Sequence, residues 1–215
     1  MHPHRPHKLR KKSNGLSLFQ IATSSNDFLS SFVLEPIRLI KVMCTKIKTI
    51  DEFNKLDDET AKLLLMACCT SSNWQNQMLE KRPFTSRETM DFHAEKTWFN
   101  LSVDDRLEGF SGHPRIGNKE TLRKKFTVSE AWSKNEQQGV NSASEDLLED
   151  LTELNNLYFK KFGFVFLICA TGKTAEEMLN ALQERVNCTY DDEISTASEE
   201  HNKITLLRLN KLFDN

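Results

Sequence analysis

Apolar residues recur at three- and four-residue spacing through almost all of the chain that follows Thr49. This spacing places them on one side of an α-helix and is typical of helices that pack against a core. It is clearest over residues 145–162, where it predicts one long amphipathic helix. The expected apolar face of that helix consists of Leu147, Leu148, Leu151, Leu154, Leu157, Tyr158 and Phe162. A chain with this pattern is restricted to folds in which helices pack on helices.

Candidate N-terminal caps divide the rest of the chain into further helices. An Asp, Ser or Thr side chain at this position accepts a hydrogen bond from the first backbone N–H groups of a helix. The expected caps are Asp51, either Asp57 or Asp58, Ser86 and Thr174. The helical spacing before Ser86 ends at Arg82-Pro83-Phe84, because proline lacks a backbone donor and clashes with the preceding turn. Two more helices are expected, over 103–110 and from about 192 to 213.

Only residues 164–170 could form a strand. The segment is apolar and partly β-branched, but one strand without a partner is at best marginally stable. It is therefore expected to be a buried helix or an extended segment that ends at Thr171-Gly172. The predicted fold class is all-α, with a single compact multi-helix domain over residues 43–215 and an extension over residues 1–42.

The composition excludes several classes of protein. At 215 residues, with 38% hydrophobic and 28% charged residues, the chain has the character of a soluble globular protein that can bury a core. A net charge of −2 argues against a general nucleic-acid binder, and the longest apolar run is too short to span a membrane. Five cysteines without CxxC spacing, two of them adjacent at Cys68-Cys69, indicate buried thiols in a reducing compartment.

Residues 1–42 are basic and rich in serine, and contain only two acidic residues. Three interpretations fit this composition. The segment is a disordered extension upstream of a start at Met43, an organelle transit peptide, or a nucleic-acid-binding arm. The third is the least favoured, because no aromatic residues alternate with the basic ones to form a stacking site.

His113-Pro114 is the candidate site of proton transfer. Imidazole titrates near neutral pH and can therefore both donate and accept a proton, and proline restricts the backbone beside it. A single His-Pro pair is a weak signal, since most histidines have no catalytic role. His93 and His201 lack partners at metal-ligand spacing and are interpreted as structural. The sequence contains no HExxH, no glycine-rich phosphate loop and no GxSxG motif.

Ser133, Glu136 and Gln137 are spaced so that their side chains share one face of a helix. Two interpretations fit equally well. The residues form an N-terminal capping box, or they form a polar surface that binds a ligand.

The order of eight short motifs is more informative than any one of them. They are Cys68-Cys69-Thr70-Ser71-Ser72-Asn73-Trp74, Arg82-Pro83-Phe84, Trp98-Phe99-Asn100, His113-Pro114-Arg115-Ile116-Gly117, Ser133-x-x-Glu136-Gln137, Leu154-Asn155-x-x-Tyr158, Phe162-Gly163-Phe164-x-Phe166 and Lys203-Ile204-x-x-Leu207-Arg208-Leu209. In this order they resemble the 2-oxo-4-hydroxy-4-carboxy-5-ureidoimidazoline (OHCU) decarboxylases. The residues of these motifs are most similar to those in the decarboxylase half of the plant allantoin synthases, the bifunctional transthyretin-like proteins. The resemblance covers about residues 50–213.

The resemblance implies an all-helical, commonly homodimeric enzyme that needs no cofactor and converts OHCU to (S)-allantoin in the last step of urate degradation. It implies that His113 is the catalytic proton donor. It implies a substrate site formed by Pro114, Ser133, Lys134, Asn135, Glu136, Gln137, Phe166, Leu167, Ile168, Cys169, Ala170 and Arg208. Val165 stands at a position where many animal members have proline; plant-like members also lack this proline.

The sequence ends at Asn215 without the hydroxyisourate hydrolase module of the plant fusion. We therefore expect the hydrolysis step to come from a separate hydrolase with which this chain pairs functionally. The competing hypothesis is a catalytically silent paralogue that serves as a helical protein-interaction module; a lyase for a related ureido compound is a weaker alternative.

The ending Phe213-Asp214-Asn215 is not a Ser-Lys-Leu-like peroxisomal signal. A cytoplasmic location is therefore the default, with a peroxisomal one or targeting by residues 1–42 left open.

Overall fold

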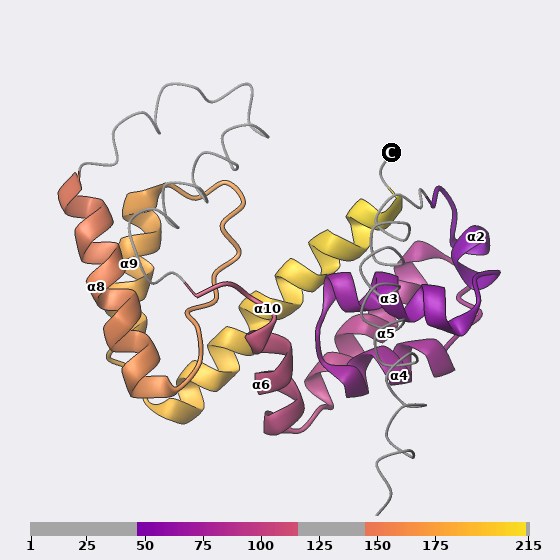
Figure 1. Ribbon diagram of the computed structural model, residues 1–215, viewed down its shortest axis with the longest axis horizontal. Coiled ribbons are helices and arrows are strands. Elements are labelled where there is room, and N and C mark those ends of the chain that lie inside the picture. Colours follow the sequence, from indigo (N-terminus) through magenta and orange to yellow (C-terminus); the bar gives the residue numbers. More distant parts are fainter. Residues whose placement is uncertain (1–46, 116–144, 214–215) are drawn as a thin grey trace, which may run out of the picture. The chain divides into compact units, whose positions relative to one another are not determined.

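The computed structural model describes residues 47–115 and 145–213. Within these two ranges the chain forms eight α-helices and no strand (Figure 1). The helices are α2 (Ile50–Asn54), α3 (Asp58–Cys68), α4 (Ser72–Glu80), α5 (Arg87–Phe99), α6 (Val103–Ser111), α8 (Glu145–Phe162), α9 (Ala175–Arg185) and α10 (Tyr190–Phe213). The predicted all-α class is confirmed for the described residues. The predicted domain start near residue 43 lies outside them and stays a prediction.

Most of the predicted caps are confirmed. Asp57, Ser86 and Thr174 each accept a hydrogen bond from the third backbone N–H of the helix that follows. The prediction for Asp51 is wrong, because Thr49 caps α2 and accepts from the Glu52 N–H at 3.2 Å. Asp51 lies instead in the first turn, where a negative charge interacts favourably with the helix dipole.

A break between α3 and α4 was not predicted. Apolar spacing continues across it, but Cys69 has an extended backbone and the Ser71 side chain caps a new helix. The Gln75 side chain closes the turn by donating to the Cys69 carbonyl at 3.0 Å. The chain therefore changes direction where periodicity alone suggested a continuous helix.

The long helix α8 has the predicted bounds, but one residue of its predicted apolar face is wrong. Leu157 is 51% exposed and lines a shallow surface hollow with Leu154 of α8 and Gln183 of α9. Leu148, Leu151, Tyr158 and Phe162 are buried. α9 packs against α8, and Leu157 stays exposed beside that contact, in the hollow that Gln183 of α9 also lines.

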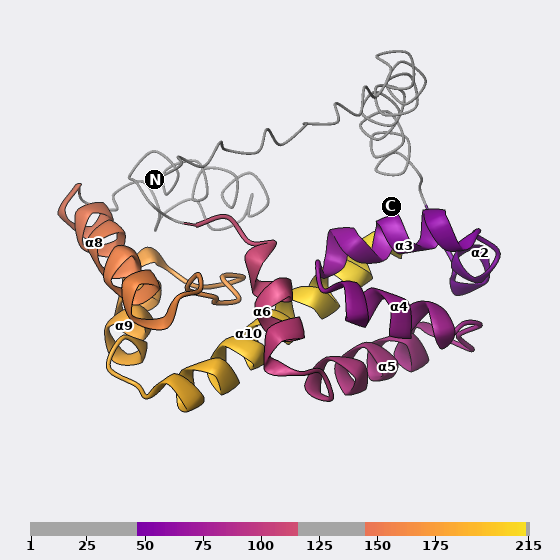
Figure 2. The ribbon, with the colours of Figure 1, turned by 60° about the horizontal axis from the view of Figure 1, so that its bottom comes forward.

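α10 joins two groups of helices. α3, α4, α5 and α6 pack together along one part of it, while α8 and α9 pack on each other near its beginning (Figures 1 and 2). The first group surrounds Trp74 and Trp98, which are fully buried and donate their indole N–H groups to the Ala94 and Ser198 carbonyls. The Trp98 bond, 2.9 Å long, fastens α5 to α10. α10 is therefore the element that fixes the rest of the domain.

Residues 164–170 are irregular, so the helical alternative for this segment is wrong. Gly163 ends α8 with φ of 80° and donates to the Phe159 carbonyl, a conformation that favours glycine. A turn at Thr171-Gly172 then leads to α9, as predicted. The segment from Phe164 to Ile168 is largely buried, so the predicted burial is confirmed.

Candidate active site

His113 lies just after α6, in a tight connection. Its backbone N–H donates to the Phe110 carbonyl at 3.1 Å, which continues the last turn of the helix. Gly112 makes this turn fit, because a Cβ there would lie only 2.9 Å from the Thr70 Cβ and closer still to the rest of that side chain. The His113 side chain is half-buried, and its ring centroid lies 5.1 Å from that of His201 in an edge-on arrangement.

His201 is the innermost residue of this site. It is fully buried on α10 and stacks on Trp98 with ring centroids 4.1 Å apart. Its Nε2 lies 3.2 Å from the Gly109 carbonyl and its Nδ1 lies 3.3 Å from the Thr205 hydroxyl. Because a carbonyl only accepts, Nε2 carries the hydrogen and Nδ1 accepts from Thr205.

The environment of His201 keeps its ring neutral. Burial first, then the neighbouring charges of His113 and Arg208, lower the pKa of His201 to about 3, against the opposing effect of the Gly109 hydrogen bond. His201 was expected to be structural, and its contact with His113 was not predicted from the sequence. His201 lies seven residues before Arg208, two turns along one helix face, and this spacing is the signal that could have placed His201 beside the candidate site.

Arg208 is half-buried and donates from Nη1 to the Cys68 carbonyl at 3.2 Å, at the end of α3. Burial raises the pKa of Cys68 and of Cys69 to about 12, although the Arg208 charge opposes the increase. Both thiols are free and buried, which confirms the prediction for this pair. They therefore remain protonated and are unsuited to act as nucleophiles.

The segment 166–170 is bound to the scaffold through its main chain. The Leu167 carbonyl accepts from Nη1 of Arg185 at 2.6 Å, and the Cys169 N–H donates to the Glu200 carboxylate at 2.7 Å. Glu200 precedes His201 on α10, so the segment runs beside the helix turn that contacts His113. The Phe164 ring, 5.3 Å from that of Phe110, continues this packing to α6.

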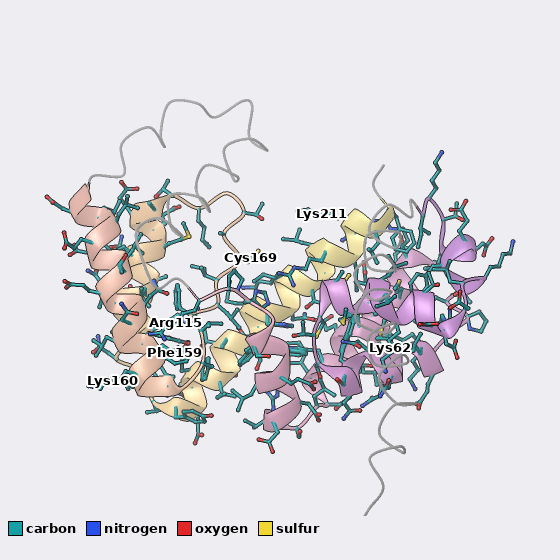
Figure 3. All side chains as sticks on the ribbon, viewed as in Figure 1. Lys62, Arg115, Phe159, Lys160, Cys169 and Lys211 are labelled. Atoms are coloured by element: carbon teal, nitrogen blue, oxygen red, sulfur yellow. The ribbon has the colours of Figure 1, made fainter. Side chains whose placement is uncertain are left out.

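Pro114 and Arg115 lead away from His113 toward α8. Pro114 is exposed. The Arg115 guanidinium donates to the Asn156 side chain at 3.0 Å and lies 4.1 Å above the Phe159 ring. Figure 3 shows Arg115 and Phe159 near each other. No role for Arg115 was predicted from the sequence, yet this contact attaches the loop carrying His113 to α8.

Three parts of the predicted site therefore lie around α10: His113, the segment 166–170 and Arg208. The predicted residues Ser133, Lys134, Asn135, Glu136 and Gln137 lie outside the described residues, and their role stays a prediction. Across 47–115 and 145–213, no three His, Cys, Asp or Glu side chains are grouped so that they could hold a metal ion. No helix in these ranges is long and apolar enough to cross a membrane.

Residues 54–210 match the family model of the OHCU decarboxylases, so the chain belongs to this family. The resemblance drawn from the sequence is thereby confirmed. The chain is 42% identical over 147 residues to the uric acid degradation bifunctional protein TTL of Arabidopsis thaliana, a match covering 68% of this chain and 45% of that protein. It is 24% identical to the OHCU decarboxylase of Haloferax volcanii, across 77% of this chain and 96% of the relative.

Solved structures share the fold. A crystal structure of OHCU decarboxylase in the presence of (S)-allantoin is 38% identical, with a TM-score of 0.58 over 74% of this chain and the whole of that one. A crystal structure of (S)-allantoin synthase, 19% identical, has a TM-score of 0.60 over 77% of this chain and 54% of that one. The chain spans less than half of the length of the bifunctional relatives from Arabidopsis and Bacillus subtilis.

Proposed function

We propose that this protein decarboxylates OHCU to (S)-allantoin without a cofactor. Membership of the OHCU decarboxylase family supports this function, as does the likeness to a decarboxylase structure obtained in the presence of (S)-allantoin. The observation that carries it is the position of His113, which lies half-buried against the neutral ring of His201 on the same helix as Arg208. A histidine here can exchange a proton with a ligand beside α10.

The chemistry requires only proton transfer and orientation. The substrate carbon that loses carbon dioxide also bears a hydroxyl group and adjoins the imine-like ring carbon that carries the ureido group. When the carbon–carboxylate bond breaks, the ring accepts the electron pair, so that no external electron sink is needed. His113 then supplies a proton to one face of the neighbouring ureido-bearing carbon, while the hydroxyl group loses its proton and becomes the carbonyl of the product. Protonation from one face yields a single enantiomer.

The remaining predicted residues orient the substrate. Arg208 pairs through its guanidinium with a carboxylate or carbonyl oxygen, since this group forms paired charge-assisted hydrogen bonds. Glu136 and Gln137 hold the ureido and ring N–H groups. Pro114 and Phe166 to Ala170 enclose the substrate, together with Ser133, Lys134 and Asn135.

The test is the rate of (S)-allantoin formation, followed by circular dichroism, from OHCU freshly made with urate oxidase and hydroxyisourate hydrolase. His113→Asn is expected to lower the rate by about 10²–10⁴-fold, the usual contribution of general acid–base catalysis. His93→Asn is the matched control, because His93 lies on α5 against Phe84 and Phe92, apart from the site, and should leave the rate unchanged. Melting curves show whether each variant is folded.

Two results would contradict the proposal at different levels. A His113→Asn variant as fast as the wild type would remove His113 from the mechanism. A folded wild-type protein that does not exceed the spontaneous rate would refute the activity and favour the interaction-module alternative.

The finer predictions about partners and location extend this proposal. We propose a homodimer that pairs functionally with a hydroxyisourate hydrolase, in the cytoplasm or in peroxisomes. Analytical sedimentation measures the oligomeric state. A coupled assay with the hydrolase tests the functional pairing, and imaging of the tagged full chain shows its location in the cell.

A further inference from the structure

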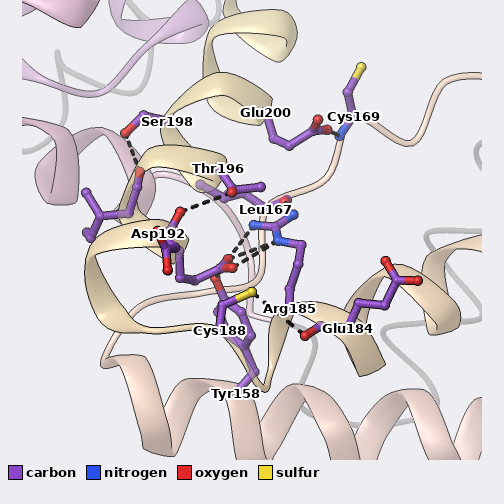
Figure 4. Close-up of polar contacts among 12 residues, drawn as sticks. Tyr158, Leu167, Cys169, Glu184, Arg185, Cys188, Asp192, Thr196, Ser198 and Glu200 are labelled. Atoms are coloured by element: carbon purple, nitrogen blue, oxygen red, sulfur yellow. Dashed lines mark hydrogen bonds and ion pairs between the residues drawn. The ribbon is translucent and has the colours of Figure 1, made fainter.

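Two side chains that the predicted site does not include bind the main chain of the segment 166–170. Arg185 at the end of α9 donates to the Leu167 carbonyl at 2.6 Å, and Glu200 of α10 accepts from the Cys169 N–H at 2.7 Å (Figure 4). Within the described ranges the segment has no strand partner, so its main-chain groups need such contacts to stay in place. These two bonds hold it at alternate residues.

Arg185 is itself firmly held. Its Nε lies 3.0 and 3.2 Å from the two carboxylate oxygens of Glu193, which is fully buried and also accepts a hydrogen bond from the Tyr158 hydroxyl. The guanidinium carbon lies 4.6 Å from the centre of the Phe166 ring. The anchor at Leu167 is therefore fixed by residues of α8, α9 and α10 together.

Glu200 is the more adjustable anchor. Its side chain is 14% exposed, and besides the Cys169 N–H it binds the ammonium group of Lys203, one turn later, at 2.6 Å. Lys203 is 56% exposed, so the carboxylate stands between solvent and the segment. The residue after Glu200 is His201, whose ring contacts His113. The anchor at Cys169 thus belongs to the same helix turn as the predicted proton-transfer site.

We propose that Arg185 and Glu200 are positioning residues that hold the segment 166–170 in register with His113 for substrate binding. This inference rests on the proposed function, because the role of the segment 166–170 in substrate binding is part of that proposal. The physical reason is preorganisation: a binding segment without regular structure keeps its geometry only if residues behind it fix its main chain. Neither residue touches the substrate in this account; each acts through the backbone it holds.

Glu200 provides the cleaner test, since removal of Arg185 leaves Glu193 buried without its partner and endangers folding. Glu200→Met deletes the acceptor for the Cys169 N–H at similar size. Glu200→Gln keeps a carbonyl oxygen at that place. Lys203→Met is the matched control, because it removes the ion pair with Glu200 but leaves the bond to Cys169.

Two measurements are made on the full chain. Hydrogen exchange followed by mass spectrometry reports the protection of the amides of residues 164–172, independently of activity. Steady-state kinetics with OHCU, together with calorimetric titration of (S)-allantoin, report binding. Glu200→Met is expected to speed exchange in this segment and to raise KM about 10-fold or more, with a smaller change in kcat, because a hydrogen bond to a charged group that serves binding is lost. Glu200→Gln should restore most of both, and Lys203→Met should match the wild type.

Each outcome decides a separate point. Equal exchange in Glu200→Met and the wild type would overturn the anchoring role. Faster exchange with unchanged KM and unchanged (S)-allantoin affinity would overturn the link to substrate binding. A wild type that neither turns over OHCU nor binds (S)-allantoin would refute the proposed function, while the exchange comparison would still test whether Glu200 holds the segment.

Discussion

Replacing Arg185 with methionine should destabilise the protein more than most single substitutions. Methionine keeps an unbranched apolar chain but removes the guanidinium, together with its contact on the Phe166 ring. Among the described residues, the Glu193 carboxylate, with no exposed surface, would then retain only the Tyr158 hydroxyl as a partner, and the Leu167 carbonyl would lose its Arg185 donor. A buried charge without compensation is the costliest product of such a change.

The expected loss in the free energy of unfolding is about 3–5 kcal/mol, the usual result of breaking a buried ion pair from one side. In a protein of this size each 1 kcal/mol corresponds to roughly 2–4 °C in Tm, so the midpoint should fall by about 6–20 °C. Adding Glu193→Gln removes the uncompensated charge while leaving an acceptor for Tyr158. The double variant should therefore be more stable than Arg185→Met alone.

The measurement is urea denaturation followed by far-ultraviolet circular dichroism for the wild type, both single variants and the double variant. Lys203→Met serves as the control for the loss of an exposed cation, and should change the stability by only about 0–1 kcal/mol. A loss below about 1 kcal/mol for Arg185→Met, or strictly additive effects in the double variant, would refute the reasoning. Additivity would mean that the two buried charges do not stabilise each other.

Two further predictions concern the neighbourhood of His113. Gly112→Ala should cost about 1–3 kcal/mol in urea denaturation, because its Cβ would overlap the Thr70 side chain, and Thr70→Ala should recover part of the loss; equal stabilities of Gly112→Ala and the wild type would contradict this contact. Because burial depresses the pKa of His201 to about 3 in the folded state, from 6.5, the unfolded state binds more protons between these values. The His201 contribution to stability is therefore complete above pH 6.5 and decreases as the pH falls toward 3, by up to about 1.4 kcal/mol per pH unit. His201→Gln should flatten the dependence of stability on pH between 6 and 4, and an unchanged slope would refute the assignment.

Local patterns were sufficient for most of the secondary structure. The bounds of α8 and the caps Ser86 and Thr174 follow from residues that are close in sequence, because capping and amphipathic spacing act within a few residues. The same locality explains the errors. The break before Ser71 and the exposure of Leu157 depend on which surfaces neighbouring helices cover, and no local pattern contains that information.

The candidate site also combines residues that the sequence indicates with contacts that only the tertiary structure fixes. The sequence by itself identified the family, and through that resemblance it named His113 and Arg208 as candidate site residues, because short motifs carry residue identity whatever surrounds them. Only the tertiary structure decided that His201 is neutral and lies against His113, and that Arg185 and Glu200 hold the segment 166–170. Those properties arise from burial and from contacts between helices distant in the chain, where the low dielectric and the fixed geometry of the core act on groups that sequence spacing does not bring together.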